Sequence, residues 1–307
     1  MTLDDTQEQA APTQATSDDA KPLREARTPS ARAMAVAGQV AQRNNGRNMP
    51  LRRSFSERPD NSGELTPLAR MLRGGRGGSV RLRLYMSYLW LGAAPPHSLA
   101  YPARAWAELL DLEDPSNSGA RRVADAVRWL EKNGFIEVEN RAGTPNVVHL
   151  LSDDGRGKPY ELPGAAYNRL SQKGSPAARR HRYIQLPPEL WTSGWMAVLS
   201  ASALAMLIIL YTHTGTKDPE GEELWIAPDY ATQTYVLAEE TRTRGLRELQ
   251  LAGIITVRRR ELVANDSFDF RRFRNVYRLQ PSALRLPAFI PATSRRIQAL
   301  TTQDLDD

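Results

Sequence analysis

Residues 128–138 read RWLEKNGFIEV, and residues 247–257 read RELQLAGIITV. The two stretches align without a gap, with identical residues at five of eleven positions. Each stretch is typical of a helix end, a left-handed glycine stop and a strand. A second strand-like segment follows each copy, VVHLL at 147–151 and VYRLQ at 276–280. We also expect a helix, a short strand and another helix before each copy. The sequence therefore predicts two copies of one supersecondary unit.

The segment GARRVADAVRWLEKN (119–133) predicts the helix that ends in the first copy. Val123, Val127 and Leu130 recur at helical spacing and predict its core-facing side. Asn133 and Gly134 supply the stop, and NRAGTP joins the two strands as a hairpin. In the second copy the equivalent start of the helix contains Thr241, Arg242, Thr243 and Arg244.

Composition predicts the boundaries around these two units. Of the 22 Phe, Trp and Tyr residues, only Phe55 precedes Val80, and such a segment buries too little apolar surface to offset its chain entropy. The acid-free stretch from Arg169 to Arg182 is typical of a basic linker. We therefore expect a disordered region (1–79), a first unit (80–152), a linker (153–187), a second unit (188–280) and a partly disordered C-terminal tail (281–307).

One uncharged stretch, Leu190 to Thr216, raises the alternative of a membrane helix. Ser200 and Ser202 dilute its apolar run, and no cluster of basic residues closely flanks it. A buried helix capped by Ser202 is the favoured interpretation. The polar start MTLDDTQEQA lacks the pattern of a signal peptide, so we expect a cytoplasmic, nucleoid-associated protein.

The residue inventory argues against an enzyme. The chain has no Cys, which excludes thiolate nucleophiles, disulfides and Cys-based zinc sites. The four His are scattered and form no metal-binding pair. RGGRGG lacks the Lys-[Ser/Thr] that completes a phosphate-binding loop. We expect no catalytic activity, no cofactor, no metal and no small-molecule ligand.

The element order helix, strand, helix, helix, strand, strand, with a third helix ending R-x-L-x-x-x-G-x-I-x-V, resembles the winged helix-turn-helix superfamily. Regulators of the MarR type contain such a unit, and plasmid replication initiators carry it in tandem. The resemblance covers about 80–151 and 188–280 and implies a mainly α fold with small β-hairpins (α+β). The loop EDPSNS (113–118) departs from the usual tight turn between the second and third helices.

In such a unit the third helix enters the major groove and the hairpin contacts the backbone. Arginine suits both contacts because its planar fork binds guanine or phosphate with two hydrogen bonds. The expected DNA contacts of the first unit are Ser118, Arg121, Arg122, Arg128 and Arg141. Those of the second are Thr241, Arg242, Arg244, Arg247, Arg258, Arg259, Arg260, Arg271, Arg272 and Arg274.

Each of these patterns has a plainer explanation. An arginine-rich helix face is often only solvated, and Phe268, Phe270 and Phe273 are more typical of hairpin packing than of base stacking. Basic residues in both units nevertheless favour a sequence-specific double-stranded DNA-binding protein, acting as a transcriptional regulator. The alternatives are a replication initiator of a plasmid or integrative element, or a winged-helix protein-protein adaptor. A homodimer is left open.

Overall fold

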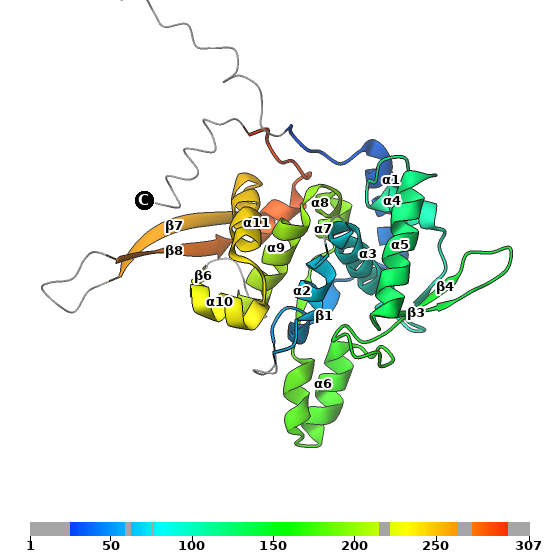
Figure 1. The fold of residues 1–307 in the computed structure, drawn as a ribbon, viewed down its shortest axis with the longest axis horizontal. Helices are drawn as coiled ribbons and strands as arrows, with labels where there is room; N and C mark the ends of the chain where they lie inside the picture. Colours follow the sequence, from blue (N-terminus) through cyan, green and yellow to red (C-terminus); the bar gives the residue numbers. More distant parts are fainter. Residues whose placement is uncertain (1–24, 59–62, 75–76, 215–221, 263–271, 294–307) are drawn as a thin grey trace, which may run out of the picture.

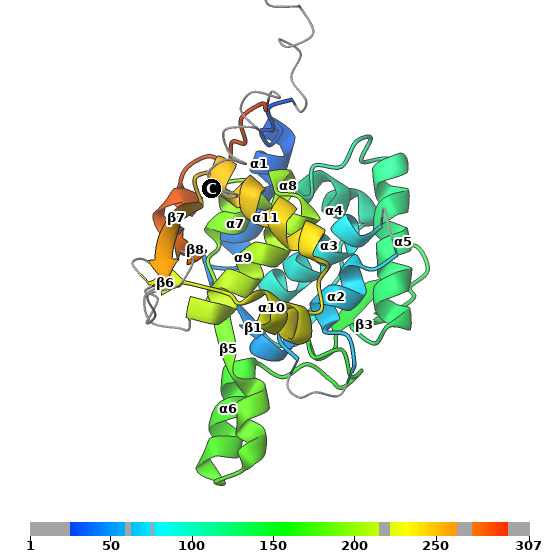
Figure 2. The same ribbon diagram turned by 60° about the vertical axis from the view of Figure 1, so that its left-hand side comes forward.

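The computed structural model describes residues 25–58, 63–74, 77–214, 222–262 and 272–293. Helices alternate with three small antiparallel sheets around one continuous apolar core. Two hairpins extend from opposite sides of the molecule, and a short helical projection leaves it on a third side (Figures 1 and 2). The coarse expectation of helices with small hairpins is confirmed.

The two repeated stretches fold into units with the same element order and the same sheet order. Unit 1 contains α3 (Gly78–Leu91), β2 (Ser98–Leu99), α4 (Ala103–Leu109), α5 (Ser118–Lys132), β3 (Ile136–Glu139) and β4 (Val147–Leu150). Unit 2 contains α9 (Ala201–Thr214), β6 (Glu223–Leu224), α10 (Pro228–Tyr235), α11 (Glu239–Leu251), β7 (Ile255–Leu262) and β8 (Arg272–Leu279). In both, the last strand lies in the middle of the sheet: β2-β4-β3 and β6-β8-β7.

The helix ends of the two copies match in detail. Gly134 and Gly253 have left-handed φ values of 73° and 70°, as expected for the stop after each helix. The next amide, of Phe135 or Ile254, then donates to the helix carbonyl five residues before it, at 3.0 Å in each unit. The repeated sequence therefore produces a repeated backbone geometry.

A buried polar joint connects the two units. The α3 residue Arg83 donates to the carbonyls of Ala197 and Leu199, at 3.1 and 2.7 Å, in the turn before α9. On α11, Glu248 accepts from the amide of Ser200 at 2.6 Å and pairs with Arg27 at 2.9 Å. Burial lowers the pKa of Arg83 to about 10. Because α3 and α9 also pack together, the units form one body.

The described residues of the N-terminal region, from residue 25 on, are folded although the sequence predicts disorder for 1–79, which corrects the boundary at residue 79. They form α1 (Ala31–Arg43), β1 (Met49–Arg52), the 3-10 turn η2 (Arg53–Phe55) and α2 (Pro67–Leu72). The side chains of Leu51, Phe55 and Leu68 are fully buried. Few apolar residues suffice here because they insert into a core that the rest of the chain provides. Residues 1–24 lie outside the described part.

The expected linker is also structured. It contains α6 (Pro163–Gln172), the 3-10 turn η3 (Pro176–His181) and β5 (Tyr183–Leu186), which pairs antiparallel with β1. At its root, the buried Arg52 pairs with the buried Asp153 and donates to the carbonyl of Glu161 at 2.7 Å and to His181 Nδ1 at 3.1 Å. The basic stretch is therefore a fixed projection, with α6 and η3 packed together.

The uncharged stretch forms α7 (Glu189–Thr192), α8 (Trp195–Val198) and α9, which is buried along almost its whole length. No helix in the described ranges has the length and apolar character needed to cross a bilayer. The cap of α9 is Ser200, whose Oγ accepts from the amide of Ala203 at 3.1 Å, and not the expected Ser202. The C-terminal segment stays folded through η4 (Pro281–Arg285) to Ile290, which bridges to Arg27.

Candidate nucleic-acid interface

The outer face of α5 is the most strongly basic helix face of the two units. The helix is fixed by Val123, Ala126 and Leu130, which are buried. Arg121, Arg122, Arg128 and Lys132 are exposed, and the first turn contains no acid. Arg128 pairs with Asp125 on the same face, and its side chain is 75% exposed. Ser118, also exposed, begins the helix. All four expected contacts on this helix therefore face solvent.

The hairpin of unit 1 carries little net positive charge. Arg141 is exposed and donates from Nε to Glu139 at 2.9 Å. His149 lies on the same carboxylate at 3.2 Å. Hydrogen bonds from Arg141, and then from His149, lower the pKa of Glu139. Arg141, the expected DNA contact of this hairpin, is therefore exposed, but the carboxylate of Glu139 offsets its positive charge.

The structure corrects the expectation for Arg242. Its side chain is 8% exposed and donates to the carbonyl of Pro228 at 3.3 Å and to Thr232 Oγ1 at 3.2 Å. It therefore joins α11 to α10 and does not face a groove. The sequence already indicated this burial, because extending the ungapped alignment of the two copies places Arg242 opposite the core residue Val123.

The exposed face of α11 is less basic than that of α5. Its first turn contains Glu239 and Glu240, both exposed. Arg244 is 47% exposed and lies 4.0 Å from Glu240. Thr241 and Arg247, the remaining expected contacts, are partly exposed. The cation that α11 offers near its start is therefore Arg244.

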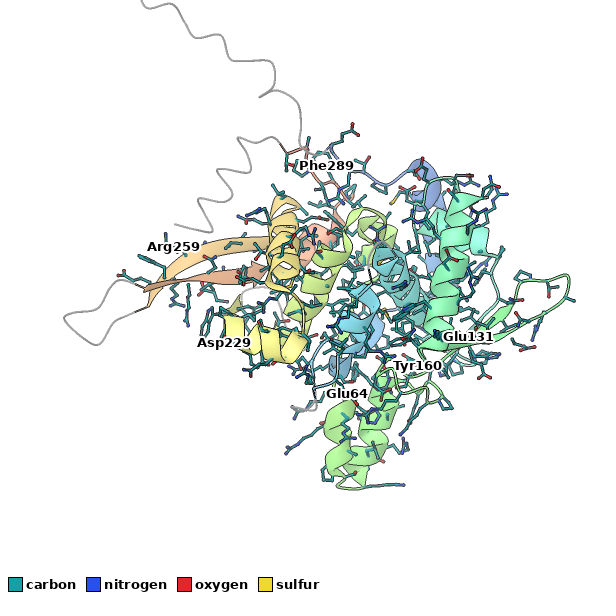
Figure 3. The ribbon with its side chains drawn as sticks, viewed as in Figure 1. Glu64, Glu131, Tyr160, Asp229, Arg259 and Phe289 are labelled. Atoms are coloured by element: carbon teal, nitrogen blue, oxygen red, sulfur yellow. The ribbon has the colours of Figure 1, made fainter. Side chains whose placement is uncertain are left out.

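The hairpin of unit 2 concentrates the positive charge. Paired residues of neighbouring strands share a face, so Arg258, Arg260 and Arg274 lie on one face, and Arg259 lies on the other. Arg260 also binds Glu223 at 2.9 Å. Figure 3 shows Arg259 far out on this hairpin. Arg271 lies outside the described residues, as do Phe268 and Phe270, and only the backbone of Arg272 is described.

The stretch predicted as a basic linker forms a further basic surface on the projection, although no site residue was predicted there. Lys173, Arg179, Arg180 and Arg182 are exposed there. Arg169, on α6 of the same projection, pairs with Glu161 at 2.8 Å. The absence of acidic residues from 162 to 188 indicates this positive charge in the sequence. A linker, however, is not expected to hold its side chains in a fixed arrangement, so no binding site was predicted there.

The described residues line small cavities, one of them about 210 Å³ and bordered by Ser54, Arg58 and Arg70, among others. They contain no group of three or more His, Cys, Asp or Glu able to hold a metal ion. A cavity of about 130 Å³ between α10, α11 and β8 is lined by Tyr235, Arg242 and Tyr277, among others. Its size is below the usual range for drug-sized ligands.

Comparison with known proteins assigns no relative, because no family model, curated protein or solved structure matches this chain.

Proposed function

We propose that the chain is a sequence-specific double-stranded DNA-binding protein made of two tandem winged helix-turn-helix units, acting as a transcriptional regulator. One observation carries the proposal: both units have the same element order and sheet order, and each sets an exposed third helix beside a hairpin. That is the arrangement in which a helix enters the major groove while a hairpin contacts the backbone.

The two units have different tasks in this proposal. The start of α5 combines exposed Arg121 and Arg122 with a first turn free of acids, which suits contact with base edges. The start of α11 carries Glu239 and Glu240, which phosphates repel. Unit 2 therefore contributes mainly through its basic hairpin, whose arginines neutralise phosphates without reading sequence. Arg244 is its candidate for a base contact.

The protein-protein adaptor is the weaker alternative. Its marker is an exposed apolar patch on the third helices. The large apolar side chains that are exposed in the described structure are Trp225, Tyr230, Phe273, Leu286 and Phe289, and none lies on α5 or α11. The replication initiator shares the DNA-binding chemistry of the regulator. A map of bound genomic sites separates the two, because iterons at an origin differ from a promoter operator.

The proposal is tested by selecting bound duplexes from a random pool. The wild-type chain is expected to enrich a common sequence. The variant Arg121→Ala/Arg128→Ala should lose that enrichment, with each base contact that disappears costing about 1–3 kcal/mol at the selected site. Arg47→Ala is the matched control, because Arg47 is an exposed arginine after α1, outside both units. Absence of any enriched duplex would refute the proposal.

A further inference from the structure

Four aromatic side chains are exposed in the described structure, and the two on the hairpin side of unit 2, Trp225 and Phe273, are the ones that have an arginine against the ring. Trp225 follows β6 and is 44% exposed, and Phe273 lies on β8 and is 43% exposed. Of the other five tryptophans, four are buried and Trp129 is partly covered by Arg81, whose Cζ lies 4.8 Å from its ring centroid. Contact of such large rings with water is unfavourable, so a partner that covers the rings would gain free energy by burying them.

Each of these two rings has an arginine against it. The Cζ of Arg274 lies 4.7 Å from the ring centroid of Trp225, and the Cζ of Arg259 lies 4.2 Å from that of Phe273. The strand register puts Arg259 and Arg274 on opposite faces of the hairpin. Each face therefore combines an aromatic ring with a cation.

Duplex DNA makes poor use of these rings. Its bases are stacked on each other, and its outer surface presents phosphates, which an arginine binds without the help of an aromatic ring. Unpaired bases differ, because each has a free π-face that stacks on an aromatic side chain. Single-strand binding surfaces combine such rings with cations that follow the backbone. An apolar protein partner is a poorer fit, since Arg258, Arg259 and Arg260 occupy three successive positions of β7.

We infer that the β7–β8 hairpin, together with Trp225, binds unpaired DNA bases, stacking one base on each of the rings of Trp225 and Phe273. The arginines beside the rings hold the neighbouring phosphates. This inference rests on the proposed function only in that the hairpin lies against DNA, and it adds single-stranded DNA as a second substrate of unit 2. A chain that holds a duplex through α5 and an unpaired strand through this hairpin can stabilise locally opened DNA.

The test measures binding of an oligo(dT) strand and of a blunt-ended, fully paired duplex to the full chain by fluorescence anisotropy. Oligo(dT) is expected to bind the wild type. Trp225→Leu and Phe273→Leu retain an apolar side chain but remove the ring, and each should weaken oligo(dT) binding by roughly 5- to 150-fold. Duplex affinity should change by less than about twofold, since the phosphate contacts remain. Phe289→Leu is the matched control, because this exposed phenylalanine lies far from the hairpin (Figure 3).

Tryptophan fluorescence gives an independent readout. Trp225 is the most exposed tryptophan in the described structure, so oligo(dT) should quench the wild type and protect it from acrylamide. Trp225→Phe should lose both effects but keep binding.

Failure of oligo(dT) to bind, or equal losses in Phe289→Leu, would overturn the inference. Equal losses for duplex and oligo(dT) in the ring variants would also overturn it, and tighter binding of oligo(U) would make RNA the substrate instead. Binding of oligo(dT) without any duplex binding would refute the proposed function and leave this inference standing.

Discussion

Arg242 and Arg244 lie two positions apart on α11, and their replacement by alanine should have opposite consequences. Arg242 is 8% exposed and makes two hydrogen bonds to α10. A hydrogen bond from a charged donor contributes about 1.5–3 kcal/mol, and these two are long, so we expect Arg242→Ala to lower the free energy of unfolding by about 2 kcal/mol. For a chain of 307 residues that loss corresponds to a melting temperature lower by about 3–4 °C.

Arg244 is 47% exposed, so Arg244→Ala should change stability by less than about 0.5 kcal/mol. It should instead weaken binding at the selected duplex. The assay is a thermal melt of both variants by circular dichroism, followed by duplex titration at a temperature where both are folded. If Arg242→Ala left the melting temperature unchanged but abolished sequence preference, its side chain would face the DNA and the assignment would be wrong.

Further changes test the folded N-terminal region, the root of the projection and the hairpin. Phe55→Ala removes a fully buried ring that stacks on Tyr85 with centroids 6.0 Å apart, and it should cost about 3–5 kcal/mol in urea denaturation, whereas Gln39→Ala on the exposed face of α1 should cost almost nothing. Asp153→Ala leaves Arg52 as an unpaired buried charge and should destabilise the chain by about 3–5 kcal/mol, and an unchanged urea midpoint would contradict the buried pair. Burial, and then the Arg52 guanidinium, lower the pKa of His181 below 6.5. The unfolded chain therefore takes up the proton first, stability should fall as the pH drops below that value, and His181→Gln should flatten the dependence of the urea midpoint on pH. Arg258→Ala/Arg260→Ala should weaken binding to all duplexes alike and reduce the salt slope by about one per lost phosphate contact, whereas a sequence-dependent loss would mean that the hairpin reads bases.

The repeated units were predictable because their signals are local. Helical spacing of Val123 and Leu130, glycine stops at Gly134 and Gly253, and alternating strands depend on residues close in the sequence. The structure bears out the element order of both copies. The winged-helix assignment and the DNA contacts stay predictions.

The prediction of disorder was wrong for the described residues between 25 and 79, because the stability of that part does not come from local contacts. Phe55 stacks on Tyr85 of α3. Strand β1 pairs with β5, which begins at Tyr183, 131 residues after β1 ends at Arg52. A low density of apolar residues is a sound sign of disorder only when a segment must build its own core. Here Leu51 and Phe55 complete a core made by other segments.

Arg242 shows a different limit. An arginine near the start of the third helix suggested a DNA contact. The position of Arg242 on α11 is equivalent to that of the buried Val123, however, and this position faces the core whichever residue occupies it. Glu248 is a parallel case, since it falls opposite Trp129 and is buried against the amide of Ser200. Mapping the buried position of Val123 onto the second copy would have identified Arg242, whereas Trp129 is only partly buried and gives a weaker signal for Glu248.

The most direct measurement is the affinity of the full chain for a selected duplex and for its scrambled counterpart, each titrated between about 50 and 300 mM salt. Both affinities should fall linearly with salt on logarithmic axes, because arginines displace counterions from the phosphates. The selected duplex should stay at least about 10³-fold tighter throughout. No binding to either duplex at low salt, or equal affinity for both, would contradict the proposed function.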